Sequence, residues 1–230
     1  MFYWLIFGIF MALSLAVQQT MKSKFKKYSK EMLQAGLTGK EVAEKMLRDN
    51  GITDVTVSSV YGYLTDHYNP LNKTLNLSSE VYNGTSVASA AVAAHECGHA
   101  VQHAEAYAWL NLRSSLVPAV QFGSRWSQWV LLAGLLLISF SENSKIGGIL
   151  LLVGIGLFAL TTIFAFVTLP VEFNASNRAL AWLETSGLVS GEQHDHAKNA
   201  LKWAARTYEV AALSSLATLL YYVLIYLRRS

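Results

Sequence analysis

Ala93-Ala94-His95-Glu96-Cys97-Gly98-His99-Ala100 is the stretch around which this chain is organised, because it carries the pattern His-Glu-x-x-His among helix-favouring residues. The run from residue 86 to about residue 106 contains no proline, one glycine and many alanines. Such a composition favours an α-helix, and Thr85 or Ser86 can serve as its N-cap. We therefore expect the pattern to lie on a helix.

The spacing of His95 and His99 suits a metal ion. Residues four apart lie one turn apart on the same helix face, so both imidazoles can reach one ion with Glu96 beside them. Neutral imidazole binds Zn²⁺ well, and a catalytic zinc site takes three protein ligands. Glu96 would then be the general base that takes a proton from the attacking water and returns it to the leaving amine. The competing interpretation makes both histidines hydrogen-bonded core residues.

The third ligand must come from elsewhere in the chain. His103 continues the spacing of the motif, but on a straight helix it lies about 12 Å along the axis from His95, so we expect it to neighbour the site. Glu172 is the better choice, because it follows Pro170, which can open a new helix. The alternative for Glu172 is a solvated carboxylate favoured at a helix start by the macrodipole.

Three regions together resemble the YugP-like bacterial family of membrane zinc metallopeptidases. They are His95-Glu96-Cys97-Gly98-His99-Ala100-Val101-Gln102-His103, Asp66-His67-Tyr68-Asn69-Pro70 with the nearby Lys73-Thr74-Leu75-Asn76-Leu77-Ser78, and Pro170-Val171-Glu172-Phe173-Asn174-Ala175-Ser176. More distantly, the chain is similar to the HtpX and CAAX-prenyl membrane proteases, in which a Glu from a later helix completes the site. The resemblance implies His95, His99 and Glu172 as ligands of one Zn²⁺ per chain, and Glu96 as catalytic base.

One position departs from the pattern of those wider relatives. They commonly carry an Asp four residues after the ligand Glu, where it can hold a ligand His, whereas this chain has Ser176. A serine could still make a weaker hydrogen bond to an imidazole. Ser176, His103 and His67 are therefore the further candidates near the site, although Asn69-Pro70 marks a turn that favours an exposed position for His67.

The composition indicates a membrane protein. Hydrophobic residues make up 53% of the chain and charged residues 14%, against about 25% charged residues in soluble domains. The net charge of +3 gives no case for nucleic acid as a partner, and a single cysteine, Cys97, excludes an internal disulfide.

We predict a mainly α multi-pass membrane protein of about four transmembrane helices with a zincin-like domain that contains a small β-sheet. Glycines at 147, 148, 154 and 156 could let helices pack closely. The predicted parts are an N-terminal anchor (1–20), a zincin-like domain (21–121), a transmembrane hairpin (122–169), a helical segment with the third ligand (170–209) and a C-terminal span (210–230).

The positions of the basic residues predict how the chain is oriented in the membrane. Lys22, Lys24, Lys26, Lys27 and Lys30 follow the first apolar segment, which places the zincin-like domain and the active site at the cytoplasmic face of the plasma membrane. The hairpin then returns the chain to the same side, so Glu172 can meet the motif. Arg228 and Arg229 oppose this orientation, but the lysines outnumber them.

Local patterns predict the smaller elements of the domain. Thr38-Gly39-Lys40-Glu41 reads as a capping box that opens a helix to Asp49. Residues 55–57, 60–64 and 74–78 have the composition of short strands. An edge of such a sheet could bind an extended peptide through main-chain hydrogen bonds.

The predicted function is a membrane-bound zinc peptidase that acts on membrane-associated or misfolded proteins, so the expected partners are a protein or peptide substrate and the lipid bilayer. The alternative is a non-catalytic scaffold or chaperone-like module with a structural metal. A structural site has a closed shell of ligands and does not need the base Glu96. A transporter would need ionisable residues inside its spans, which the sequence lacks apart from Arg125 at an edge.

Overall fold

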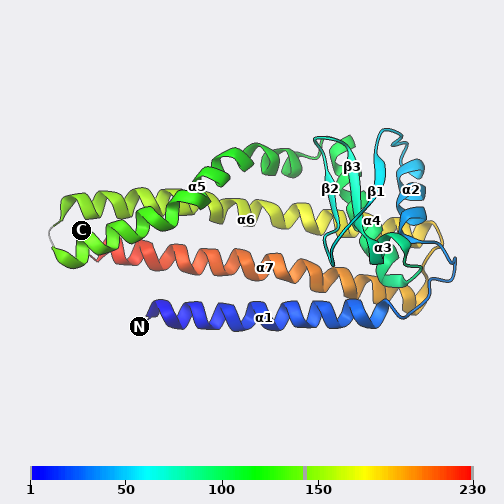
Figure 1. Cartoon of the computed structure of the whole chain (residues 1–230), viewed down its shortest axis with the longest axis horizontal. Helices are drawn as coiled ribbons and strands as arrows, with labels where there is room; N and C mark the ends of the chain where they lie inside the picture. The colour runs from blue at the N-terminus through cyan, green and yellow to red at the C-terminus, as the bar shows by residue number, and fades with distance from the viewer. Residues whose placement is uncertain (1, 142–143, 229–230) are drawn as a thin grey trace. The chain divides into compact units, whose positions relative to one another are not determined.

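The computed structural model describes residues 2–141 and 144–228. These residues form a mainly helical structure with one small sheet (Figure 1). The elements in chain order are α1 (Phe2–Tyr28), α2 (Gly39–Asp49), β1 (Thr56–Val60), β2 (His67–Asn69), β3 (Thr74–Ser78), α3 (Ser79–Asn83), α4 (Val87–Ala104), α5 (Ala108–Phe140), α6 (Lys145–Thr185) and α7 (Gly191–Leu227).

Three of the described helices, α1, α6 and α7, are long and apolar enough to cross a membrane. The second span predicted from the sequence falls within α5, which is not among these three. Three candidate spans agree with a multi-pass membrane protein, and a fourth span stays a prediction.

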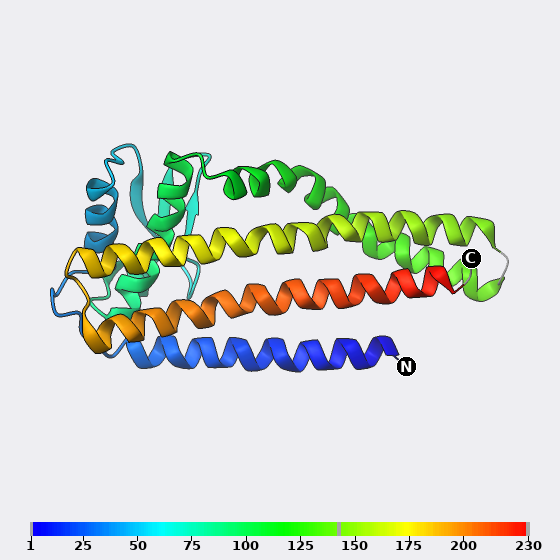
Figure 2. The same ribbon diagram turned by 180° about the vertical axis from the view of Figure 1, so that it is seen from behind.

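One helix start predicted from the sequence is wrong. Pro170 does not open a helix, because α6 continues through it without a break (Figure 2). Helix α7 runs without interruption from Gly191 to Leu227, so residues 210–227 of the predicted C-terminal span form the later part of a longer helix. A proline removes one backbone donor from a helix, and long apolar helices tolerate this loss where their surroundings compensate for it.

The contacts of the chain divide it into two compact units. The first, here called the helical unit, comprises residues 1–15, 112–169 and 208–230, and the second, the mixed unit, comprises residues 16–111 and 170–207.

In the helical unit, α5 and α6 pack closely at small residues. A Cβ added at Gly134 would lie 2.7 Å from the backbone nitrogen of Leu151, and one added at Gly154 would lie 2.8 Å from Leu131 Cγ. Gly147 also meets side chains of α5, whereas Gly148 and Gly156 face open space. The predicted role of glycines in close packing is thus confirmed at two of the four positions.

In the mixed unit, the sheet has the order β1-β3-β2, with β1 parallel and β2 antiparallel to β3. The strand predicted over residues 60–64 is wrong, because β1 ends at Val60 and Gly62 and Leu64 adopt positive φ of 123° and 56°. The strand at residues 74–78 is confirmed. The remaining strand, β2, lies at His67–Asn69, directly before the turn that the sequence indicated at Asn69-Pro70.

Helix α4 lies in the core of the mixed unit. Its alanines at 88, 90, 91, 93, 94 and 100 are at most 1% exposed. They pack with residues of α2 and β3, among them Val42, Met46, Leu75 and Leu77, which are also at most 1% exposed. Small side chains on several faces let neighbouring elements approach this helix closely, which fixes its position in the unit.

Candidate metal centre

The helix that carries the motif has the predicted start. Ser86 is the N-cap, and its hydroxyl accepts a hydrogen bond from the backbone N–H of Ser89 at 3.1 Å. The helix ends at Ala104, and Ala106 then takes a positive φ of 51°. His95, Glu96 and His99 therefore lie within a regular helix, as the sequence predicted.

Gly98 allows α6 to approach the motif. A Cβ at this position would lie only 2.6 Å from the carbonyl oxygen of Ala175 and 3.0 Å from its Cα. Both contacts are with backbone, which cannot rotate away as a side chain could. The two main chains therefore touch at Gly98, and Glu172, one turn before Ala175 and Ser176 on α6, comes beside the histidines.

His95, His99 and Glu172 meet at one point. Glu172 Oε2 lies 3.3 Å from His95 Nε2 and 3.7 Å from His99 Nε2, and the three candidate ligand atoms all lie within 4.8 Å of one another. Ligand atoms at about 2.0–2.2 Å from a tetrahedral zinc lie roughly 3.3–3.6 Å apart. The spacing and the nitrogen and oxygen donors therefore fit zinc.

Ser176 stands behind His95. Its hydroxyl lies 3.1 Å from His95 Nδ1, the ring nitrogen opposite the one that faces Glu172. A hydroxyl can donate or accept, so it can pair with either state of Nδ1. The sequence suggested that Ser176 could form a weaker hydrogen bond to an imidazole where wider relatives carry an Asp. The structure places Ser176 in such a position.

Gln102 stands behind His99 and was not singled out from the sequence. Its side chain is fully buried, with Oε1 3.0 Å from His99 Nδ1 and Nε2 2.8 Å from the carbonyl oxygen of Val171. A carbonyl can only accept, so the amide nitrogen must face Val171 and Oε1 must face the imidazole. His99 therefore carries its proton on Nδ1, which leaves the Nε2 lone pair directed at the metal position.

The contacts of Gln102 extend to the protein surface. Its amide nitrogen also donates to Asn174 Oδ1 at 2.9 Å, and the same oxygen accepts from Arg178 Nε at 2.7 Å. Arg178 in turn pairs with Glu105 just beyond the end of α4, at 2.6 Å. These bonds join α4 to α6 on the side of the site occupied by Gln102.

Glu96 lies between the two histidines and is 8% exposed. Its Oε2 accepts a hydrogen bond of 3.1 Å from the backbone N–H of Tyr68, in the edge strand β2. Burial raises the pKa of the Glu96 carboxyl, although the imidazoles of His95 and His99 act against this shift. A buried carboxyl with a raised pKa and one oriented oxygen suits a general base.

The remaining candidates lie apart from the three metal-facing atoms. His103 Nδ1 pairs with the hydroxyl of Tyr68 at 2.8 Å. His67 is exposed on β2, with Nδ1 2.9 Å from the carbonyl oxygen of Thr65. Cys97 is fully buried and its thiol contacts the carbonyl oxygen of Ala43 at 3.4 Å, in agreement with a packing role.

Comparison with known proteins identifies the family to which the chain is similar. A family described as "Putative neutral zinc metallopeptidase" matches residues 3–227. The chain is 42% identical over 219 residues to "Putative membrane protease YugP" of Bacillus subtilis (strain 168), which covers 94% of this chain and 93% of that relative. No solved structure matches the chain significantly.

Proposed function

Because the chain belongs to the putative neutral zinc metallopeptidase family, we propose that it is a membrane-bound zinc peptidase that hydrolyses peptide bonds. The observation that carries this proposal is the meeting of His95, His99 and Glu172, whose ligand atoms lie within 4.8 Å, next to the buried carboxyl of Glu96. Three protein ligands leave one position open, as catalytic zinc sites require.

Each residue of the site has a separate role in the proposed reaction. Bound zinc supplies a Lewis acid that polarises a carbonyl oxygen and activates water. Glu96 accepts the proton of the attacking water and delivers it to the leaving nitrogen, while the N–H of Tyr68 keeps the carboxyl oriented. Ser176 and Gln102 hold the rings of His95 and His99 in place.

The edge of the sheet offers a place for the substrate backbone. β2 pairs with β3 on one side only, and the N–H of Tyr68 points away from β3 toward Glu96. An extended peptide added along this open edge would therefore run past the catalytic carboxyl. We propose that the substrate backbone binds in this way.

The location of the site suggests the class of substrate. We propose that α5 supplies the fourth crossing, that the mixed unit faces the cytoplasm, and that membrane-associated or misfolded proteins are the substrates. The support is the apolar character of α1, α6 and α7, the lysine cluster at the end of α1, and the description of the B. subtilis relative as a membrane protease.

Zinc content and cleavage, measured together, test the proposal. Detergent-purified wild type, Glu172→Gln and Glu96→Gln are analysed for zinc by elemental analysis and incubated with an unfolded reporter protein. We expect about one zinc per wild-type chain. Glu172→Gln should lose the zinc, and Glu96→Gln should keep it while losing cleavage.

Two results would contradict the proposal. Full zinc in Glu172→Gln would exclude Glu172 as a ligand and return attention to His103 and His67. Undiminished cleavage by Glu96→Gln would remove the peptidase assignment, and a protein that binds zinc but cleaves nothing would fit the alternative, a scaffold with a structural metal.

A further inference from the structure

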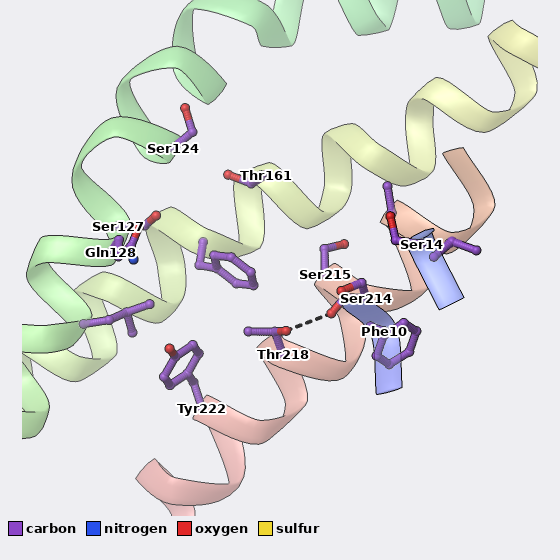
Figure 3. A pocket seen from close by; sticks show the side chains of 14 residues that line it. Phe10, Ser14, Ser124, Ser127, Gln128, Thr161, Ser214, Ser215, Thr218 and Tyr222 are labelled. Carbon is purple, nitrogen blue, oxygen red and sulfur yellow. Dashed lines mark hydrogen bonds between the residues drawn. The ribbon is translucent and has the colours of Figure 1, made fainter. Parts of the chain in front are cut away.

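The helical unit contains a cavity whose mainly apolar lining includes several hydroxyl groups. Its volume is about 500 Å³, and it is bordered by α1, α5, α6 and α7 (Figure 3). This size falls within the roughly 300–1,000 Å³ typical of ligand sites. Hydroxyl or amide groups come from all four helices: Ser14 of α1, Ser124, Ser127 and Gln128 of α5, Thr161 of α6, and Ser214, Ser215, Thr218 and Tyr222 of α7.

The lining is neutral. Among the described residues that line the cavity there is no Lys, Arg, His, Asp or Glu. Recognition of an anionic lipid headgroup requires basic side chains, and ion pathways through membranes carry ionisable groups. The cavity therefore suits an uncharged ligand that forms hydrogen bonds.

The hydroxyl of Thr161 is available to form a hydrogen bond with a ligand. The hydroxyls of Ser215 and Thr218 donate to backbone oxygens of their own helix, at 2.8 and 2.9 Å. Thr161 Oγ1 is buried and has no partner among the residues that the structure describes. Its neighbour Thr162 donates to the carbonyl oxygen of Phe158 at 3.4 Å and lies outside the cavity. An unpaired buried hydroxyl is unfavourable, so a ligand that pairs with Thr161 would gain binding energy.

The hydroxyls of α7 form a row. Ser215, Thr218 and Tyr222 lie on one helix face over about 10 Å, given a rise of about 1.5 Å per residue. An extended polypeptide covers that length with about three residues. A row of this length fits an extended backbone better than a compact group, because the Ser215 and Thr218 oxygens, whose protons are bonded within α7, can still accept from N–H groups of that backbone.

An extended peptide backbone inside a membrane needs hydrogen-bonding partners, which such a cavity can supply. A helix in lipid pairs all of its own backbone groups, but a peptidase needs its substrate opened and extended, which exposes N–H and C=O groups. Leaving those groups unpaired in an apolar environment is costly. We propose that the cavity binds a short non-helical stretch of a membrane-embedded polypeptide substrate, an inference that rests on the proposed peptidase function.

The test measures binding without cleavage. Full-length Glu96→Gln protein in lipid nanodiscs is titrated with a fluorescent leucine-alanine transmembrane peptide interrupted by a central Gly-Pro pair, and with the same peptide uninterrupted. We expect tighter binding of the interrupted peptide. Thr161→Val, added to this background, should weaken that binding by about 2- to 10-fold, the value of one hydrogen bond, and leave the uninterrupted peptide unaffected.

Thr162→Val is the matched control, because its hydroxyl is already bonded within α6. It should bind the interrupted peptide like the parent protein. Thr161→Val removes no internal hydrogen bond, so we expect it to fold, and its thermal unfolding is measured beside the titration. Equal affinity of Thr161→Val and its parent for the interrupted peptide would overturn the proposal. Displacement of the peptide by diacylglycerol would also overturn it, because the cavity would then be a lipid site.

A soluble unfolded reporter separates this proposal from the proposed function. Wild-type protein is incubated with that reporter, whose cleavage depends on the catalytic centre and needs no membrane cavity. If wild type cleaves nothing while the interrupted peptide still binds through Thr161, the peptidase function fails and the cavity stands as a peptide-binding site.

Discussion

The amide nitrogen of Gln102 donates to the carbonyl oxygen of Val171 at 2.8 Å, and Val171 directly precedes Glu172. Because the oxygen of the same amide faces His99 Nδ1 at 3.0 Å, one buried side chain fixes both an imidazole and the main chain next to the proposed carboxylate ligand. Two of the three metal-facing groups thus depend on one residue of α4.

Gln102→Leu should therefore weaken zinc binding by about 10- to 100-fold, the range seen when groups behind metal ligands are removed. Competition with a chromophoric chelator measures the affinity. Gln102→Glu keeps an acceptor for His99 but loses the donor to Val171, so its affinity should lie between those of Gln102→Leu and wild type. Gln121→Leu, at an exposed position of α5, is the control. Wild-type affinity in Gln102→Leu would show that the imidazole needs no such support.

Ser176→Ala should weaken zinc binding by up to about 10-fold, because His95 Nδ1 loses its partner at 3.1 Å. Ser176→Asp restores a stronger acceptor and should bind zinc at least as tightly as wild type. Ser115→Ala removes an exposed hydroxyl elsewhere and should change nothing. The same competition assay reports all three variants, and an unaffected Ser176→Ala would contradict the role given to this hydroxyl.

Gly98→Ala should lower both stability and zinc affinity. The added methyl group would collide with the backbone of Ala175, and overpacking of this kind costs about 1–3 kcal/mol. Because α6 must move away, Glu172 would leave the two imidazoles. Gly156→Ala is the control, since a Cβ there meets nothing within 4 Å. Thermal unfolding and zinc stoichiometry measure the two effects, and intact zinc binding in Gly98→Ala would refute the steric explanation.

Removal of the metal should lower the melting temperature of wild type. The ligand atoms meet only when α4 and α6 are folded together, so zinc binds the native state and stabilises it, by about 2.7 kcal/mol at a free zinc concentration 100 times Kd. Glu172→Gln should show little or no shift between zinc and chelator. The comparison is made by differential scanning fluorimetry, and an equal shift in both proteins would point to zinc bound elsewhere.

The sequence was most informative where chemistry depends on local spacing. His95 and His99 share a face because a helix repeats every 3.6 residues, and Ser86 and Thr38 are N-caps in the structure as predicted. The position of Ser176 behind His95 also agrees with the expectation based on its separation from Glu172. These features depend on residues a few positions apart.

Features that depend on tertiary contacts could not be predicted in this way. Gln102 owes its importance to its contact with Val171, 69 residues away. The one signal in the sequence was a glutamine three positions after His99, and so on the same face of the motif helix. The strand β2 is only three residues long and exists through its pairing with β3. Pro170 has a strong local tendency to begin a helix, but the surrounding span continues through it.

The burial of Cys97 has a practical consequence for mapping the chain in a membrane. It is the single cysteine of the protein, it is 0% exposed, and burial raises the pKa of its thiol well above the ordinary value, so it should resist maleimide reagents. Wild type is therefore a ready background for single-cysteine labelling. On the predicted orientation, an impermeant maleimide added outside intact cells should modify Ser141→Cys and spare Leu71→Cys, although both positions are exposed in the folded chain.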